Sequence, residues 1–271
     1  MSLPFDLSTL DLDAYLRRIG YAGALDPGSA TLEALHLAHA SRIPFENLDI
    51  LLGRPIRLDL GSLQAKLVRD GRGGYCFEQN LLLAAVLGRV GFDVTPLAAR
   101  VRYRITRAVP RTHALLLVET GGERWLADVG FGLEGLLMPV PLRAGAESTQ
   151  YGRRYRIVAE AGGWALQMHE AGAWTDLYAF TPEPQLVADF EMASHYTSTL
   201  PASPFVRNLV VQLPGPERRK VLRNRELAID DGATVDRRTI ESDDELLDVL
   251  AREFGLRFAA GTRFAIPDAL A

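Results

Sequence analysis

The spacing of apolar residues changes sharply at Gly91, and this change constrains the fold more than any other feature of the sequence. Before Gly91 the apolar residues recur at helical spacing, as in residues 12–19 and in the long run 76–90. After Gly91 come short runs rich in β-branched and aromatic residues, separated by turns that contain glycine. A chain in which helices precede a series of such strands is expected to adopt an α+β fold.

We expect helices in the first part of the chain and short strands in the middle. The helices cover residues 12–19, 31–40, 63–68 and 76–90, and the strands cover residues 92–103, 114–118, 125–129, 155–159, 164–168 and 174–179. Strands joined by short turns form an antiparallel meander, here a small barrel or a strongly curled sheet. Residues 181–204 are rich in proline and polar residues, so we interpret them as a crossover connection.

The end of the chain mixes both kinds of element. Residues 208–213 and 225–229 are expected strands, and Ser242 with Glu245 forms a capping box that opens a helix ending at Gly255. The sequence therefore predicts three units, which are a helical bundle over residues 1–90, a β-barrel over residues 91–200 and an α/β lid over residues 201–271.

Composition narrows the classes of function. A net charge of −4 does not attract nucleic acid or an anionic membrane, and no apolar stretch is long enough to cross a bilayer. A single cysteine excludes an internal disulfide, which fits a reducing compartment. The first residues lack the basic start and apolar core of a signal peptide. We therefore expect a cytoplasmic protein without a nucleic-acid or membrane partner.

The single cysteine, Cys76, stands where a nucleophile would be activated. It follows Gly73 and Gly74 and precedes the apolar run 81–90, so we expect it at or near the N-terminus of a helix. The unpaired N–H groups at a helix N-terminus favour the thiolate, which is the nucleophilic form. Two glycines without Cβ atoms leave room for the close approach of an acyl group. The alternative interpretation is a buried cysteine that only fills space in the core.

His113 and Asp128 are predicted to share one face of a β-hairpin. A two-residue loop at 120–121 would place His113 directly opposite Asp128. A loop at 121–122 would place His113 opposite Gly130, with Asp128 as a diagonal neighbour on the same face. A three-residue loop would separate the two side chains unless a bulge intervened. Two of these registers give the histidine the carboxylate partner of a Cys–His–Asp triad, and a purely structural pair is the alternative.

The other histidines have no evident chemical partners. His36 and His39 are three residues apart on an expected helix, with no acidic or cysteine residue at metal-ligand spacing. We interpret both as surface or packing residues. His169 and His195 also lack partners, and the basic run 218–220 reads as a solvated face. We expect no metal and no redox cofactor.

Several short segments, spread over most of the chain, form a recognisable set. They are residues 13–21, 43–48 (Ile-Pro-Phe-Glu-Asn-Leu), 72–78 (Arg-Gly-Gly-Tyr-Cys-Phe-Glu), 112–113, 128–132 (Asp-Val-Gly-Phe-Gly) and 203–205. In these segments and in their order the sequence resembles the arylamine N-acetyltransferase family. The segment around the cysteine is the most specific of them.

The resemblance implies a helical bundle, a β-barrel and an α/β lid, with a cysteine-protease-like triad formed by Cys76, His113 and Asp128. It implies an acetyl-CoA-dependent acyltransferase with a ping-pong mechanism. In this mechanism Cys76 takes an acetyl group from acetyl-CoA and passes it to the nitrogen of an arylamine or arylhydrazine. Such enzymes act in xenobiotic metabolism, although a biosynthetic step would look the same in the sequence.

The resemblance also implies roles for residues around the triad. Apolar residues would line the pocket for the acceptor, namely Phe45, Val101, Phe131 and Phe205. Two further residues, Thr112 and Gly132, match positions that contact coenzyme A in the family.

Two other functions fit the same triad. A cysteine hydrolase or a transglutaminase-like enzyme would pass its acyl group to water or to another amine, and a binding protein would keep the residues without using them. The lack of a second, disulfide-forming cysteine of the papain type favours the transferase. Replacement of Cys76 by Ala separates the classes, because a binding protein keeps its affinity whereas an enzyme loses turnover.

Overall fold

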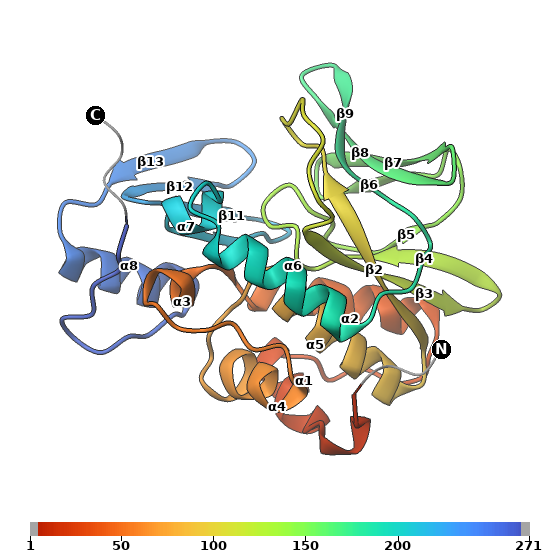
Figure 1. Cartoon of the computed structure of the whole chain (residues 1–271), viewed down its shortest axis with the longest axis horizontal. Helices are drawn as coiled ribbons and strands as arrows, with labels where there is room; N and C mark the ends of the chain where they lie inside the picture. Colours follow the sequence, from red (N-terminus) through yellow and green to blue (C-terminus); the bar gives the residue numbers. More distant parts are fainter. Residues whose placement is uncertain (1–4, 267–271) are drawn as a thin grey trace.

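The computed structural model describes residues 5–266, in which helices come first, a large sheet second and a smaller sheet with a helix last (Figure 1). This order agrees with the predicted α+β class. No helix among these residues is long and apolar enough to cross a membrane.

The N-terminal helices follow the predicted spacing closely. They are η1 (Leu7–Thr9), α1 (Leu12–Ile19), α2 (Ser29–Arg42), α3 (Leu48–Leu51), α4 (Leu60–Leu63) and α5 (Cys76–Val90). The carboxylate of Asp11 accepts the Ala14 N–H at the start of α1, and Gly20 ends this helix with a φ of 67°. The helix expected over residues 63–68 is instead a π turn, η2 (Gln64–Arg69), that continues α4.

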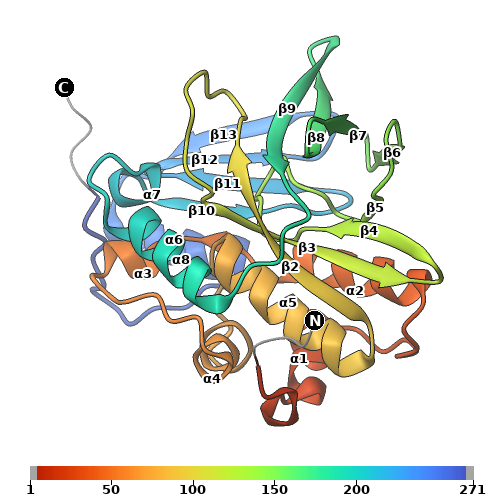
Figure 2. The same cartoon turned by 45° about the vertical axis from the view of Figure 1, so that its right-hand side comes forward.

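Helix α5 forms the centre of the molecule. Its residues from Cys76 to Leu87 are all buried, and from Leu81 to Leu87 they are apolar on every side of the helix. It lies against β2 (Asp93–Val101) and β3 (His113–Thr120), with α1 and α4 below it (Figure 2). The start of α5 is therefore held rigidly against the large sheet.

The large sheet has eight antiparallel strands in the order β5-β4-β3-β2-β9-β8-β7-β6. Besides β2 and β3 these are β4 (Glu123–Ala127), β5 (Val140–Pro141), β6 (Glu147–Gln150), β7 (Arg153–Glu160), β8 (Gly163–Glu170) and β9 (Ala173–Phe180). The sheet curls into a nearly closed barrel (Figure 1). The prediction did not include the short edge strands β5 and β6, because strands this short contain too few residues to reveal an alternating pattern.

The hairpin of β3 and β4 adopts one of the two same-face registers. Thr120 pairs with Glu123 across a two-residue turn, and both turn residues, Gly121 and Gly122, have positive φ angles of 61° and 78°. If this register is continued along both strands, His113 lies opposite Gly130. The expectation of a loop at 121–122 is therefore confirmed. The alternative loop at 120–121 is wrong, because only glycine takes this pair of conformations easily.

Residues 181–204 contain a helix, which corrects the crossover connection expected there. Helix α6 (Val187–Thr199) begins where the Asp189 carboxylate accepts the Leu186 N–H. It buries only three side chains, Phe190, Ser194 and Thr197, so its apolar periodicity is weak. It lies beside α5 and leads into the short α7 (Pro204–Arg207) (Figure 2).

The smaller sheet combines one strand from the N-terminal part of the chain with four strands from the C-terminal part. Its order is β1 (Phe45–Glu46), β10 (Val210–Leu213), β11 (Arg219–Arg223), β12 (Glu226–Asp230) and β13 (Val235–Thr239), and α8 (Asp243–Phe254) packs on it. The pairing of β1 with β10 places a strand from the predicted helical unit in the sheet of the predicted lid. The boundaries at residues 90 and 200 remain a prediction.

Strands β11 and β13 were missed because their residues are mostly charged. The basic run 218–220 is correspondingly not a simple solvated face, because its last two residues begin β11. There Arg219 donates a hydrogen bond to the Tyr151 carbonyl, and Lys220 pairs with Glu253 at 3.0 Å.

Candidate active site

Three different elements bring Cys76, His113 and Asp128 together. Cys76 is the first residue of α5, His113 is the first residue of β3, and Asp128 follows the last residue of β4. All three are almost completely buried, with exposed fractions of 5%, 3% and 1%. The predicted constellation is therefore present in space, at the place where the central helix meets the large sheet.

Four groups surround the carboxylate of Asp128, and three of them, including the imidazole, hold it by hydrogen bonds. Its Oδ2 lies 2.7 Å from Nε2 of His113, and its Oδ1 accepts hydrogen bonds from Asn80 Nδ2 and the Gly130 N–H, both at 2.9 Å. The fourth group, the Tyr178 hydroxyl, makes no hydrogen bond of normal geometry but lies near enough to be influenced by Asp128. The carboxylate is thus fixed in position before any substrate binds.

The His113 ring and the Asp128 carboxyl are both charged in the folded protein. Burial alone would lower the pKa of His113, but the Asp128 carboxylate and the Cys76 thiol outweigh it and raise this pKa to about 10. Burial likewise works against ionisation of Asp128, yet the His113 ring and the two hydrogen bonds to Oδ1 lower the pKa of this carboxyl. Around neutral pH the site therefore holds an imidazolium beside a carboxylate.

Cys76 lies close enough to His113 to contribute to the raised pKa of this histidine. Because Nε2 of His113 is bound to Asp128, the ring nitrogen left for the thiol is Nδ1. Cys76 Sγ also lies 3.7 Å from the Thr112 carbonyl oxygen. The start of a helix and the adjacent imidazolium both present positive charge to this sulfur.

Asn80 and His36 are site residues that the sequence prediction missed. Asn80 lies one turn after Cys76 and binds the Ala114 carbonyl and the Val129 N–H, in addition to Asp128. It therefore ties α5 to β3 and to the segment that follows β4.

His36 is completely buried and holds the backbone of Asp128. Its Nε2 accepts the Asp128 N–H at 3.0 Å, and its Nδ1 lies 3.0 Å from the Leu137 carbonyl oxygen. Burial lowers its pKa to about 4, so the ring is neutral. The expectation of a surface position is wrong and that of a packing residue is right. The helical spacing of His36 with Leu32 and Leu35 could have placed it on the buried face.

The glycines before Cys76 serve packing inside the protein, which corrects the expectation that they leave room for an acyl group. A Cβ atom on Gly73 would collide with the Pro44 carbonyl oxygen. A Cβ atom on Gly74 would lie 2.7 Å from Oε2 of Glu78. A side chain at either position would therefore push the loop away from the start of α5.

A cavity of about 320 Å³ opens next to Cys76 and His113. All four residues that the resemblance implied for the acceptor pocket border it, and so does Thr112; the four are Phe45, Val101, Phe131 and Phe205. Two of these rings, Phe45 and Phe205, lie 5.7 Å apart. Gly132 does not border the cavity but packs against Gln212, which does.

Much of the cavity wall comes from segments that the sequence prediction did not assign to the site. The loop between β2 and β3 and the end of α6 contribute Tyr103, Ile105, Arg107, Val109, Pro110, Tyr196, Thr197 and Leu200. Their side chains converge only through the tertiary fold, and no motif marks them in the sequence. Among residues 5–266 no group of three or more His, Cys, Asp or Glu side chains is arranged to hold a metal ion.

Comparison with known proteins decides the family. A family model described as N-acetyltransferase matches residues 30–263. The arylamine N-acetyltransferase of Mycolicibacterium smegmatis is 40% identical over 253 residues, which are 91% of this chain and 92% of the relative. The chain belongs to the arylamine N-acetyltransferase family. The Escherichia coli arylamine N-acetyltransferase is 38% identical over 90% of this chain and 88% of its own length.

Solved structures of arylamine N-acetyltransferases have the same fold. The Mycobacterium tuberculosis structure matches with a TM-score of 0.87 and 38% identity, over 91% of this chain and 94% of that one. The Mycobacterium marinum enzyme, solved in complex with CoA, matches with a TM-score of 0.85 and 35% identity, over 91% of this chain and 93% of that one. The resemblance predicted from the motifs is thereby confirmed, and the chain is an acyltransferase rather than a hydrolase or a binding protein.

Proposed function

We propose that this arylamine N-acetyltransferase moves an acetyl group from acetyl-CoA to an aromatic amine or hydrazine through an acetyl-Cys76 intermediate. The observation that carries the proposal is the buried Cys76–His113–Asp128 constellation at the wall of an apolar cavity. The Mycobacterium marinum relative, whose structure contains CoA, supports the choice of donor.

In the first half of the reaction the Cys76 thiolate attacks the carbonyl carbon of acetyl-CoA. The new bond joins Sγ to this carbon, and the bond from the carbon to the sulfur of coenzyme A breaks. The departing thiolate takes the proton that the His113 imidazolium carries on Nδ1, which leaves free coenzyme A, a neutral imidazole and acetyl-Cys76. Asp128 keeps the remaining proton of the ring on Nε2.

In the second half the amine nitrogen attacks the thioester carbon. Neutral His113 accepts a proton from this nitrogen as the new C–N bond forms, and the bond to Sγ breaks. The product is the acetylated amine, and the site returns to thiolate and imidazolium. No step needs a metal ion or an electron acceptor, because one acyl group simply changes partners.

The cavity favours a flat apolar acceptor. Phe45, Phe131 and Phe205 give it aromatic surfaces, and the ring of Phe131 lies 5.2 Å from the ring of His113. An aromatic ring placed among these side chains would present its amino nitrogen near the thioester. We assign Thr112, which borders the cavity, and Gly132, which lies behind it, to the coenzyme A path.

Steady-state kinetics test the proposal. Initial rates over a grid of acetyl-CoA and 4-methoxyaniline concentrations are expected to give parallel double-reciprocal lines, because coenzyme A leaves before the amine binds. Acetyl-CoA without amine is expected to release about one equivalent of coenzyme A per protein in a burst. Intersecting lines would contradict the proposal, since they would mean that both substrates bind together.

A further inference from the structure

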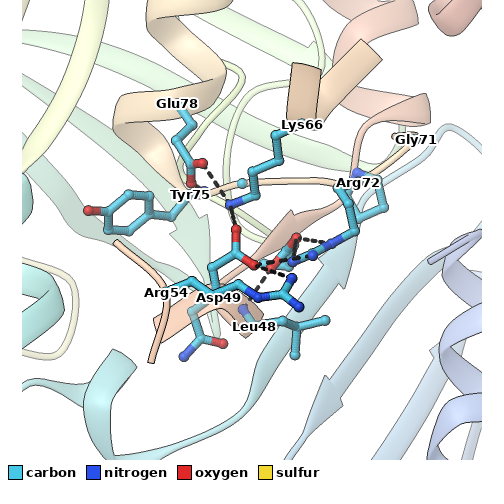
Figure 3. A network of polar contacts seen from close by, with 12 residues as sticks. Leu48, Asp49, Arg54, Lys66, Gly71, Arg72, Tyr75 and Glu78 are labelled. Atoms are coloured by element: carbon cyan, nitrogen blue, oxygen red, sulfur yellow. Dashed lines mark hydrogen bonds and ion pairs between the residues drawn. The ribbon is translucent and has the colours of Figure 1, made fainter. Parts of the chain in front are cut away.

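A buried network of charged side chains lies behind the start of α5, and the proposed reaction uses none of them (Figure 3). Lys66 Nζ lies 2.7 Å from Glu78 Oε1 and 2.8 Å from Asp49 Oδ2. Arg72 contacts Glu46 at 2.6 Å and Asp49 at 3.2 Å. Four of these residues come from the motif segments around Phe45 and Cys76 or just beside them, so the network links those segments.

Glu78 connects this network to the residue before the nucleophile. It lies in the first turn of α5, and its Oε2 accepts the backbone N–H of Tyr75 at 3.1 Å while its Oε1 receives Lys66. The absence of a side chain at Gly74 is what admits the carboxylate to this place, because a Cβ there would lie 2.7 Å from Oε2. Glu78 therefore fixes the turn that leads into Cys76.

This arrangement needs Lys66. The side chain of Glu78 is only 2% exposed, and burial raises its pKa to about 7 even though Lys66 favours its ionised form. The other charged groups that face Glu78 and Lys66 are Glu46 on β1, Asp49 on α3 and Arg72 in the loop before Cys76. Without the ammonium group the carboxylate would be left unpaired beside two other carboxylates.

We propose that Lys66 and Glu78 act as a positioning pair for Cys76, holding the Tyr75–Cys76 turn so that the thiol meets His113. The proposal rests on the proposed role of Cys76 as the nucleophile. The thiol and the imidazole sit on separate elements, α5 and β3, and a displacement of about 1 Å between reacting groups can cost on the order of a hundredfold in rate. Neither residue touches the substrate cavity.

Alkylation of the thiol separates this role from the transferase reaction. Cys76 is the only cysteine, so iodoacetamide reports on it alone and needs no acyl donor. We would measure the alkylation rate from pH 5 to pH 10, together with kcat/KM and the thermal midpoint, for Lys66→Met, Glu78→Gln and the double variant. Lys220→Met is the matched control, because Lys220 is the only other lysine and pairs with Glu253 away from the site.

The pair predicts that a neutral oxygen can replace the carboxylate, but that the carboxylate cannot stay in place without its cation. Lys66→Met removes the ammonium group that opposes the effect of burial on Glu78, so the pKa of this carboxyl rises further and the ion pairs behind the Tyr75–Cys76 turn are lost. Alkylation at pH 7 should then fall about tenfold. Glu78→Gln keeps an oxygen for the Tyr75 N–H and should stay within about threefold of the parent rate. The double variant should also return to within about threefold of the parent rate, and the same order should appear in kcat/KM.

Three results would overturn the proposal. One is a Lys66→Met profile that matches the Lys220→Met control. Another is a double variant that loses at least as much as the two single variants combined. The third is a lower thermal midpoint with an unchanged pH profile, which would mean a purely structural role. If Lys66→Met fails to fold, the proposal still requires Glu78→Ala, which removes the oxygen that accepts the Tyr75 N–H, to be alkylated about tenfold more slowly than Glu78→Gln.

Discussion

Replacing Cys76 with serine is expected to lower turnover by about four orders of magnitude or more while leaving the fold intact. A serine hydroxyl fills nearly the same space in the buried start of α5. Its proton is far harder to remove than that of a thiol, so the imidazolium of His113 no longer has a thiolate partner. The measurement is the rate of acetyl transfer to an aromatic amine, with the thermal midpoint as a check on folding.

Cys76→Ala is the companion variant for the serine exchange. It should be equally inactive but should still bind the aromatic amine, because Phe45, Phe131 and Phe205 remain in place. Serine or alanine at position 76 with more than about a tenth of the parent turnover would contradict the nucleophilic role.

Asp128→Asn is expected to reduce turnover by about four orders of magnitude. Burial is the largest influence on His113, and it lowers the pKa of the ring once the carboxylate is gone. The imidazole would then be neutral at pH 7, and the asparagine amide would donate to Nε2, which moves the ring proton to Nδ1. In that tautomer the nitrogen facing the thiol cannot accept a proton.

The measurement for Asp128→Asn is kcat/KM over a range of pH, with iodoacetamide alkylation of Cys76 alongside. Asn80 and the Gly130 N–H still have an oxygen to bind, so the thermal midpoint should change little. Full activity in this variant would contradict the assignment of His113 and Asp128 to the triad, whatever the effect of changing Cys76.

Elements with strong local signals could be predicted from the sequence. Helix α5 contains a continuous apolar run from Leu81 to Leu87 and ends at Gly91, where a φ of 110° suits glycine. The pairing of His113 with Asp128 could be narrowed to the same face of the hairpin, because side chains alternate along a strand and two glycines fill the turn.

Elements without such signals could not be predicted. Helix α6 buries little more than Phe190, Ser194 and Thr197, so its sequence reads as a polar connection. All five residues of β13 are exposed, and its place in the sheet comes from pairing with β12. In both cases the tertiary environment overrides a weak local preference.

The residues that support the site could not be predicted for a different reason. His36 lies 92 positions from Asp128 in the chain, and Lys66 lies 12 positions from Glu78 on a separate element. Neither pairing follows from helical or strand spacing. Such residues become visible only when the fold brings the buried polar groups together, which is why the motif prediction contained the triad but not its supports.

Rapidly quenched intact-protein mass spectrometry tests the central claim most directly. The protein is mixed with acetyl-CoA in the absence of amine, and the modified residue is located by peptide mapping. We predict one added acetyl group on Cys76 that disappears when an aromatic amine is added, and no adduct on Cys76→Ala. A protein that acetylates the amine without any adduct on Cys76, or with an acetyl group on another residue, would contradict the proposed mechanism.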